Sequence, residues 1–539
     1  MKYKKVIKHH FLILILIIIL CLAINLHWIL FHSPEYNSED MIILGKSLNM
    51  IKNKEPISLI NIYFMNTQPV YPTMMYYGLK YFPNLNTPLL INWFFWILLI
   101  IVTYQLTYLI YNKKAALLSA FLVVTTPGII GSSRVIYSGF ILSSLFMLSI
   151  FFIIKSNFFK NRTWSLLWAI TSAICLLTKY SMIPYVASVI GFCIFILVKN
   201  KKFSKPVLNN FLISIALLLI ICVPHYLFEE NLSTYKSRAV FPESDKGTVH
   251  TFFCDVINYP YLLLNDQLGL ILTLFLVSAI IASLVRLKKR EKMTHGKILI
   301  IFIIACVFGV FTFFIKLKSA DVIGYLIPLL IVLISGFTIS LKKKIQVSLI
   351  IFLLINGLIW IIPISFPEQI NNPREINKIK NQINCYSGTN DHFTTNTYKF
   401  FNKDIFFGKD QLLDYNKKTD SMKKIIENSH ELSTDNNVIL LDISYANHFE
   451  LELYSHIRNP NIMFRYERCE DLYLHPDVYD EIEFILQSNS LKDKMSKGTK
   501  NFPDMSVIFC NKIRDLISKE TGNNIIYQDS KHILLHRQI

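Results

Sequence analysis

The sequence predicts a polytopic α-helical membrane protein with about eleven transmembrane helices. We expect its N-terminus inside and a small C-terminal α/β domain outside. Of its 539 residues, 53% are hydrophobic and only 17% are charged, which is too apolar for an ordinary soluble enzyme. The apolar residues gather in runs close to the ~20 residues that a membrane helix needs. The charged residues are distributed unequally among the connections between these runs.

The first apolar run, residues 11–31, follows a basic leader and has no small-residue cleavage site after it. We therefore expect a retained membrane anchor rather than a removed signal peptide. The further predicted spans lie near residues 89–111, 115–132, 138–154, 164–178, 182–198, 207–228, 261–285, 298–315, 322–341 and 345–363.

The connections between the spans fix the predicted orientation. With the N-terminus inside, the inner connections hold 22 Lys and Arg residues and a single acid, Glu291. The outer connections before residue 364 hold 11 basic and 11 acidic residues. This is a strong positive-inside signal. The net charge of +18 therefore reflects membrane topology and not a nucleic-acid partner, and we expect a multi-pass protein of the plasma (inner) membrane.

The end of the chain has a different composition. Residues 1–364 are expected to form the transmembrane domain, and residues 365–539, which contain no long apolar run, a soluble extracytoplasmic α/β domain. Strands are expected at residues 437–443, 461–466, 506–510, 524–528 and 532–536, with a helix near 445–456. No residue pattern in this domain indicates catalysis, so we interpret it as a scaffold or an acceptor-docking lid.

Three acids stand in the first outer loop, residues 32–88: Glu35, Glu39 and Asp40. A carboxylate at a membrane boundary is costly to desolvate, which indicates either a solvated loop or a site. The residues that follow, 41–50, suit a short helix on the membrane surface. Glu39 and Asp40 would lie in its first turn, so stabilising the helix dipole is an alternative role for them.

Cations recur on the outer connections. Arg134 and Lys179 each lie in a tight outer hairpin, and Lys316 and Lys318 precede the tenth predicted span. Snorkelling to lipid phosphates would explain each of them singly. Together, close to the acid cluster, they could hold an anionic headgroup.

No cofactor is predicted, although a divalent metal stays open. His250 and Cys254 have a helical i, i+4 spacing, but the third and fourth ligands of a closed zinc site are not evident. No metal-ligating residues are therefore assigned.

Five short motifs occur in order on the predicted outer side. They are the acidic pair Glu39-Asp40, the turn Tyr71–Tyr77, Thr126-Pro127 followed by Arg134, the turn Leu176–Lys179, and Tyr325–Pro328 at the start of a late span. Over about residues 30–340, this series resembles the GT-C superfamily of membrane glycosyltransferases. The closest branch is that of the bacterial relatives of dolichyl-phosphate-mannose protein mannosyltransferases, which include the lipid A aminoarabinose transferases.

Two positions depart from the family pattern. The family usually has Asp-Glu where this chain has Glu39-Asp40, and many members carry an Asp where this chain has Ser138-Gly139. Both differences bear on how this chain would bind its acceptor or a metal ion.

The resemblance implies an enzyme, a hexosyl- or pentosyltransferase. It would move a sugar from a polyprenyl-phosphate carrier to a glycan, lipid or protein acceptor on the outer face of the membrane. By its position in the family motif, Glu39 is expected to act as the base. Neighbouring residues on a helix diverge by about 100°, so Asp40 would not face the same acceptor and would instead hold a cation or a backbone amide. The expected phosphate-binding residues are Arg134, Lys179, Lys316 and Lys318, and the secondary candidates are Glu35, Tyr71 and Tyr325.

Three other classes stay open. A polytopic transporter or flippase usually places ionisable groups near mid-membrane and often shows repeats, neither of which is evident here. A polysaccharide polymerase or ligase of envelope glycan assembly would be expected to carry its large outer loop between late spans. A non-catalytic envelope scaffold is the third class.

Overall fold

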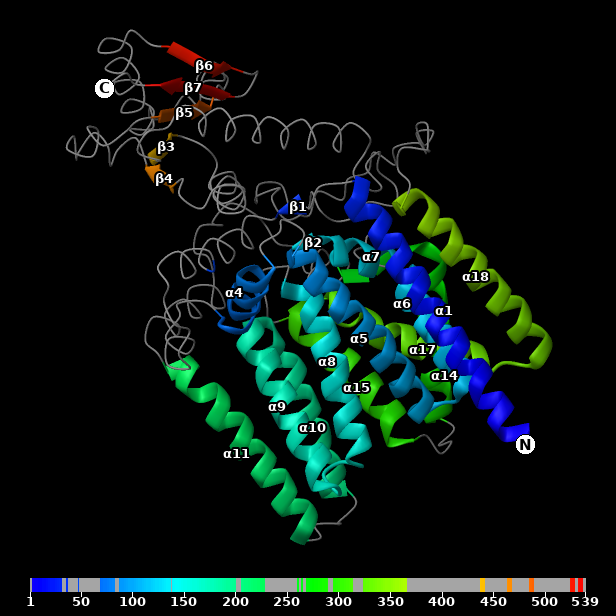
Figure 1. Ribbon diagram of the computed structural model, residues 1–539. Coiled ribbons are helices and arrows are strands. Elements are labelled where there is room, and N and C mark those ends of the chain that lie inside the picture. Colours follow the sequence, from blue (N-terminus) through cyan, green and yellow to red (C-terminus); the bar gives the residue numbers. More distant parts are fainter. Residues whose placement is uncertain are drawn as a thin grey trace. The chain divides into compact units, whose positions relative to one another are not determined.

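The structure is a computed structural model, and it divides the chain into two units that we describe separately (Figure 1). The first unit comprises Met1–Phe31, Ile57–Tyr71 and Leu89–Asp410, and the second comprises His32–Pro56, Pro72–Pro88 and Gln411–Ile539. The residues that the structure describes are 2–31, 35–36, 47, 68–82, 87–136, 138–199, 205–227, 259–260, 263–264, 268–288, 294–313, 323–365, 437–441, 463–467, 484–488, 524–528 and 532–536.

The first unit is a bundle of α-helices. In chain order they are α1 Lys2–Phe31, α5 Thr87–Ile110, α6 Lys113–Thr125, α7 Pro127–Arg134, α8 Ser138–Lys155, α9 Arg162–Thr178, the 3-10 turn η1 Tyr180–Met182, α10 Ile183–Lys199, α11 Lys205–Leu227, α14 Gly269–Lys288, α15 His295–Phe313, α17 Ile327–Ile339 and α18 Lys343–Ser365, with the short strand β2 Val135–Ile136 after α7. Each stretch predicted as a span overlaps at least one of these helices. Within the described residues, five helices are long and apolar enough to cross a membrane, and α6 with α7 makes a sixth if counted as one bent span.

The span expected near residues 115–132 is divided into two helices, α6 and α7. The chain bends by 52° between α6 and α7. Thr126 at the bend has an extended backbone, with φ −76° and ψ 126°, because the residue before a proline is sterically excluded from the helical region. Pro127 then starts α7, where its missing N–H costs no helical hydrogen bond. The result is a broken span whose second half is a short helix ending at Arg134.

Side-chain hydrogen bonds join the helices of the bundle. The Ser119 hydroxyl donates to Thr107 Oγ1 at 2.9 Å, which links α6 to α5. The Ser149 and Ser172 hydroxyls lie 2.7 Å apart and link α8 to α9. Small polar residues of this kind are typical helix contacts in membranes, where apolar burial alone does not distinguish a neighbouring helix from lipid.

A glycine allows α18 to approach the bend. An added Cβ atom at Gly357 would lie 2.7 Å from Thr125 Oγ1 and 2.8 Å from Phe121 Cε1, which is closer than real Cβ contacts come. The backbone of α18 therefore packs directly on the last turn of α6, beside the break that precedes α7.

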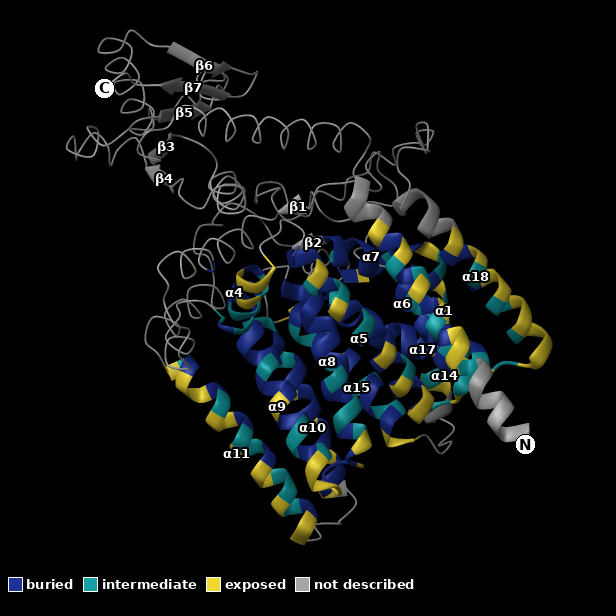
Figure 2. Ribbon diagram, viewed as in Figure 1, coloured by how far each residue is buried: buried dark blue, intermediate teal, exposed yellow. Residues whose placement is uncertain are grey.

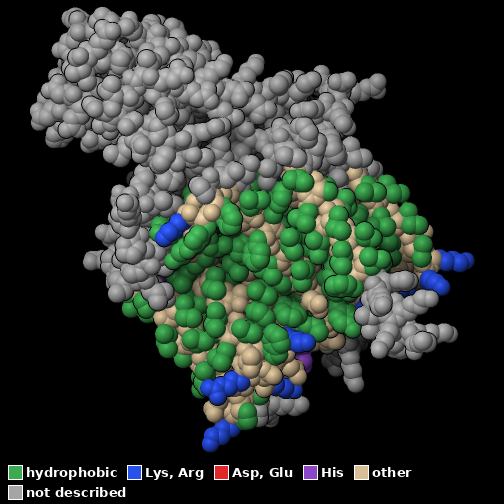
Figure 3. Space-filling model, in the orientation of Figure 1, with side chains coloured by type: hydrophobic (Ala, Val, Ile, Leu, Met, Phe, Trp, Pro, Cys, Tyr) green, Lys and Arg blue, Asp and Glu red, His purple; other side chains and the backbone are tan. Residues whose placement is uncertain are grey.

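The outside of the bundle is apolar. Figure 2 shows buried residues concentrated on the inner helices such as α8 and α17, whereas α11 and α18 each leave one face exposed. In Figure 3, hydrophobic side chains cover most of the visible bundle surface, and the Lys and Arg side chains form small groups at its lower end and right edge, with one more at the upper left. This pattern suits a protein surrounded by lipid, with cations at the edge of the bilayer.

The second unit contains the strand β1 Glu35–Tyr36, most of the helix α4 Val70–Tyr81, and a five-stranded sheet. The strands are β3 Asn437–Leu441, β4 Met463–Glu467, β5 Phe484–Ser488, β6 Asn524–Gln528 and β7 His532–His536, in the spatial order β4-β3-β5-β7-β6. β3 is parallel to β4 and β5, and β7 is antiparallel to β5 and β6.

Four of these strands confirm sequence predictions. β3, β4, β6 and β7 fall on expected segments, and β6 and β7 pair as the expected hairpin, with an irregularity between Ile525 and Tyr527. β5 was not expected. The strand predicted at 506–510 and the helix predicted at 445–456 lie outside the described residues.

Candidate functional site

Arg134 is buried at the end of the broken span. All residues of α7 except Ser132 are buried, and the Arg134 side chain is only 4% exposed. Its charge lies at the C-terminal end of a helix, where the helix dipole favours a cation. Snorkelling to lipid phosphates does not describe this residue, because a snorkelling side chain extends into the solvated headgroup layer.

Two other helices surround the end of α7. From α5, the buried Asn92 donates its side-chain amide to the carbonyl of Ser133 at 3.2 Å. From α1, the Cys21 thiol lies close enough to the Arg134 guanidinium to interact with it electrostatically. Asn25, one turn further along α1, donates to the carbonyl of Cys21 at 3.0 Å. The end of α7 that carries Arg134 is therefore held to α5 by the Asn92 hydrogen bond.

Lys179 lies at the junction between α9 and the turn η1. It is the C-cap of α9, with φ −161° and ψ 135°, and its N–H donates to the Cys175 carbonyl at 3.2 Å. Its own carbonyl accepts from the Met182 N–H at 3.1 Å, which closes the turn η1. The half-buried Lys179 is thus held by main-chain bonds on both sides.

Three ring-bearing residues beside Lys179 were not predicted from the sequence. Tyr180 follows Lys179, and its ring centroid lies 6.4 Å from that of His225 and 5.4 Å from that of Tyr226, both on α11. His225 is fully buried. The available sequence signal was weak, because His225 and Tyr226 stand near the end of one long apolar run and resemble ordinary packing residues there.

The secondary candidates Tyr71 and Tyr325 are both buried, each 1% exposed. The ring of Tyr325 lies 5.8 Å from that of Tyr185, which in turn contacts Phe146 at 5.0 Å and Phe311 at 6.1 Å. These contacts are those of an aromatic core between α8, α10 and α15. A site role for either tyrosine stays a prediction.

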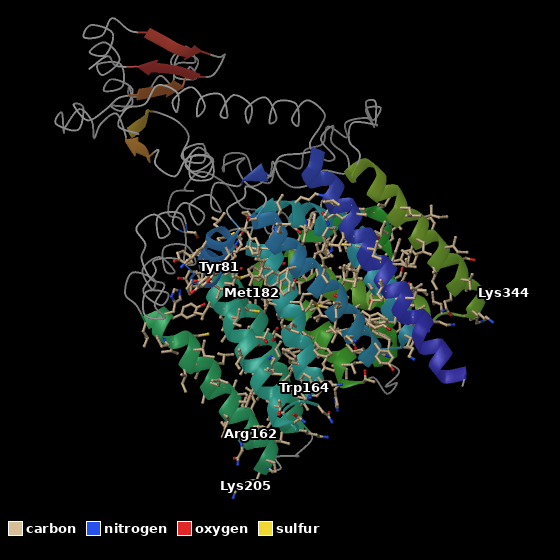
Figure 4. The ribbon with its side chains drawn as sticks, viewed as in Figure 1. Tyr81, Arg162, Trp164, Met182, Lys205 and Lys344 are labelled. Atoms are coloured by element: carbon tan, nitrogen blue, oxygen red, sulfur yellow. The ribbon has the colours of Figure 1, made fainter. Side chains whose placement is uncertain are left out.

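The two described cations of the candidate site occupy the same end of the bundle. Met182, three residues after Lys179, lies at the opposite end from Arg162 and Lys205 (Figure 4). Figure 1 places α7, which carries Arg134, toward the end where Met182 lies. The described residues of the first unit include no Asp or Glu. Chemically, this end of an apolar bundle offers a guanidinium and an ammonium to an anionic group.

Apart from Glu35, the other predicted site residues belong to segments that the structure does not describe. Glu39, Asp40, Lys316 and Lys318 lie outside the described residues, as do His250 and Cys254. Only the backbone of Glu35 is described, in β1. Among the residues that are described, no group of three His, Cys, Asp or Glu side chains could hold a metal ion.

The chain was compared with known families and structures. Residues 62–232, which include Arg134, Lys179 and His225, match the family of dolichyl-phosphate-mannose-protein mannosyltransferases. No curated protein sequence matches the chain at a significant level.

Three solved structures share the fold at 11% sequence identity each. ArnT from Cupriavidus metallidurans in the apo state has a TM-score of 0.55, with 96% of this chain and 97% of that chain covered. The same protein bound to undecaprenyl phosphate has a TM-score of 0.57, with 97% of each chain covered. The Archaeoglobus fulgidus oligosaccharyltransferase in the apo form has a TM-score of 0.51, with 89% of this chain and 70% of that chain covered.

These similarities agree with the arrangement of the helices. The family match covers the broken span and the α9–α10 junction, which carry the two described cations. The structural matches extend the shared fold over nearly the whole chain. Together, the comparisons show that residues 62–232 are similar to the dolichyl-phosphate-mannose-protein mannosyltransferases and that nearly the whole chain shares the fold of ArnT.

Proposed function

We propose that the chain transfers a sugar from a polyprenyl-phosphate carrier to an acceptor on the outer face of the membrane. The observation that carries this proposal is the burial of Arg134 within an apolar bundle, at the end where Lys179 also lies. A polyprenyl phosphate combines an anionic head with an apolar tail. The cations at this end of the bundle suit the head, and the apolar helices suit the tail. One of the similar structures is ArnT bound to undecaprenyl phosphate.

The proposed reaction is a displacement at the anomeric carbon. An acceptor hydroxyl or amine forms the new bond to this carbon, while the bond from the carbon to the phosphate oxygen breaks and its electron pair stays on the phosphate. The negative charge that develops there is stabilised by preorganised cations in a site that excludes water. We assign this role to Arg134 and Lys179, with Lys316 and Lys318 next.

The acceptor loses a proton as it attacks. A positioned carboxylate can accept that proton, which typically accelerates a reaction about 10²–10⁴-fold. We assign the role of general base to Glu39. Asp40 would have a supporting role and would hold a cation or a backbone amide. If the acceptor is itself a phosphate, little proton removal is needed, and the acid serves to position the acceptor.

The proposed orientation follows from the charge asymmetry of the sequence. The N-terminus and the Lys- and Arg-rich connections lie inside the plasma (inner) membrane. The acidic loop 32–88 and the domain 365–539 then lie outside, where the acceptor would be met. The acceptor is a glycan, a lipid or a protein of the cell envelope, and the transferred sugar is a hexose or a pentose.

The experiment is a transfer assay with purified protein and a radiolabelled polyprenyl-phosphate sugar. We expect labelled sugar to leave the carrier and join the acceptor, and the Glu39→Gln variant to lose this activity while it still folds and is expressed. Wild-type turnover by Glu39→Gln would remove the assignment of the base. Movement of the intact carrier between leaflets without sugar release would indicate a flippase instead, and joining of whole glycan chains a polymerase or ligase.

A further inference from the structure

The junction between α9 and α10 holds Lys179 outside any helix. A side chain at such a junction takes its direction from the residues on either side, because no helical hydrogen-bond ladder passes through it. Main-chain bonds from the Lys179 N–H to Cys175 and from the Met182 N–H to Lys179 fix the local backbone. The orientation of the whole junction within the bundle then depends on what packs against it.

The last turn of α11 packs against this junction. The Tyr226 hydroxyl donates to the carbonyl of Leu176 at 2.9 Å. Leu176 is in the last turn of α9, where carbonyls have no helical N–H partner. Tyr226 thus provides a tertiary cap for the end of the helix that leads into Lys179. One turn earlier on α11, the Cys222 thiol contacts the carbonyl of Ala173 at 3.7 Å, so α11 follows the end of α9 closely.

The same turn of α11 also holds the residue after Lys179. The Tyr180 ring packs on His225 at a 17° angle between the ring planes and on Tyr226 at 60°. Pro224 precedes these two residues inside α11. A proline inside a helix removes one main-chain hydrogen bond, so the last turn of α11 is tied to its own helix less firmly than an uninterrupted turn. Lys179 is therefore flanked on both sides by residues that α11 holds, Leu176 and Tyr180.

We propose that His225 and Tyr226 are positioning residues that aim Lys179 at the phosphate of the donor. This inference rests on the proposed function, in which Lys179 stabilises the departing phosphate. Electrostatic stabilisation requires the cation to be in place before the charge develops. Small displacements of a positioned group lower the rate steeply, so loosening the α11 contact is expected to lower activity through Lys179.

Tyr226→Phe is the sharpest test, because it removes one hydroxyl and keeps the ring. Its control is Asn210→Leu on the same helix, since Asn210 donates to the Phe159 carbonyl at 2.9 Å, at the other end of α11. Both variants lose one bond between α11 and a main-chain carbonyl. We expect Tyr226→Phe to lower kcat/KM for the donor about tenfold and Asn210→Leu to leave it within about twofold, with the KM for the acceptor unchanged in both. Equal effects of the two variants on the donor would overturn the inference.

A double-mutant cycle tests whether Tyr226 acts through Lys179. If it does, adding Tyr226→Phe to Lys179→Gln lowers donor kcat/KM no further than Lys179→Gln alone. Additive losses would show that Tyr226 acts elsewhere and would overturn the inference. Failure of the proposed function is distinguishable from failure of this inference. If the proposed function were wrong, the wild-type protein itself would release no sugar from the donor.

Discussion

The side-chain amide of Asn92 donates a hydrogen bond to the carbonyl of Ser133 over 3.2 Å, one residue before Arg134. The two residues are 41 positions apart in sequence, on α5 and α7. The carbonyl of Ser133 belongs to the last turn of a short helix, where helical partners are missing. Asn92 therefore caps the helix that carries the buried arginine, much as Tyr226 caps the helix that leads into Lys179.

Asn92→Leu is expected to lower both stability and donor use. The substitution leaves a buried carbonyl without its amide donor, which costs about 1–2 kcal/mol, and it frees the end of α7 to shift. Thermal unfolding in detergent measures the first effect and donor kcat/KM the second.

Ser119→Ala is the matched control, because it removes another buried bond to α5, from Ser119 to Thr107. We expect it to lower stability without changing donor kcat/KM. If Asn92→Leu unfolds at a lower temperature but uses the donor as the wild type does, Asn92 is a packing residue only.

Arg134→Lys is expected to be a poor replacement despite its retained charge. The guanidinium presents several donors in a planar fork that suits a phosphate, whereas an ammonium is a single flexible point charge. We expect transfer to fall about tenfold or more in Arg134→Lys and further in Arg134→Gln. Initial rates at saturating and limiting donor distinguish weaker binding from slower chemistry. Full activity of Arg134→Gln would contradict a role in holding the phosphate.

Gly357→Ala is expected to disturb the bend between α6 and α7. The added methyl group would meet Thr125 and Phe121, and overpacking of this kind costs about 1–3 kcal/mol. Because Thr125 immediately precedes the bend, transfer activity should fall together with the unfolding temperature.

Gly309→Ala on α15 provides the comparison, since nothing lies within 4 Å of an added Cβ atom there. It should leave activity unchanged and should not lower stability, because alanine favours a helix over glycine. Equal unfolding temperatures for the two glycine variants would show that α18 has room to move.

The sequence was most informative where composition alone determines structure. Long apolar runs predict helices, because every backbone group must be satisfied within lipid, and a helix formed in each of these runs. Thr126-Pro127 was noted as a motif, but the short helix α7 after it was not expected as a separate element, because the apolar composition continues across the proline.

Residues that meet only through tertiary packing were harder to predict. Asn92 and Tyr226 each bond to a main-chain carbonyl 40 to 50 residues away, and no local pattern indicates such partners. In the sheet, β5 was missed because acids precede it and weaken its apolar signal. Arg134 and Lys179 were predicted as site residues from the recurrence of cations on the outer connections and from the family resemblance, because snorkelling would explain each of them singly.

Binding of undecaprenyl phosphate to the purified protein tests the central claim most directly, because it does not depend on knowing the sugar. Native mass spectrometry or a competition assay would compare the wild type with Arg134→Gln and Lys179→Gln, with undecaprenol as the control ligand that lacks the phosphate. We predict that the wild type retains undecaprenyl phosphate in preference to undecaprenol, and that each variant binds it about tenfold more weakly or worse. Equal binding of undecaprenol by the wild type, or undiminished phosphate binding by both variants, would contradict the account.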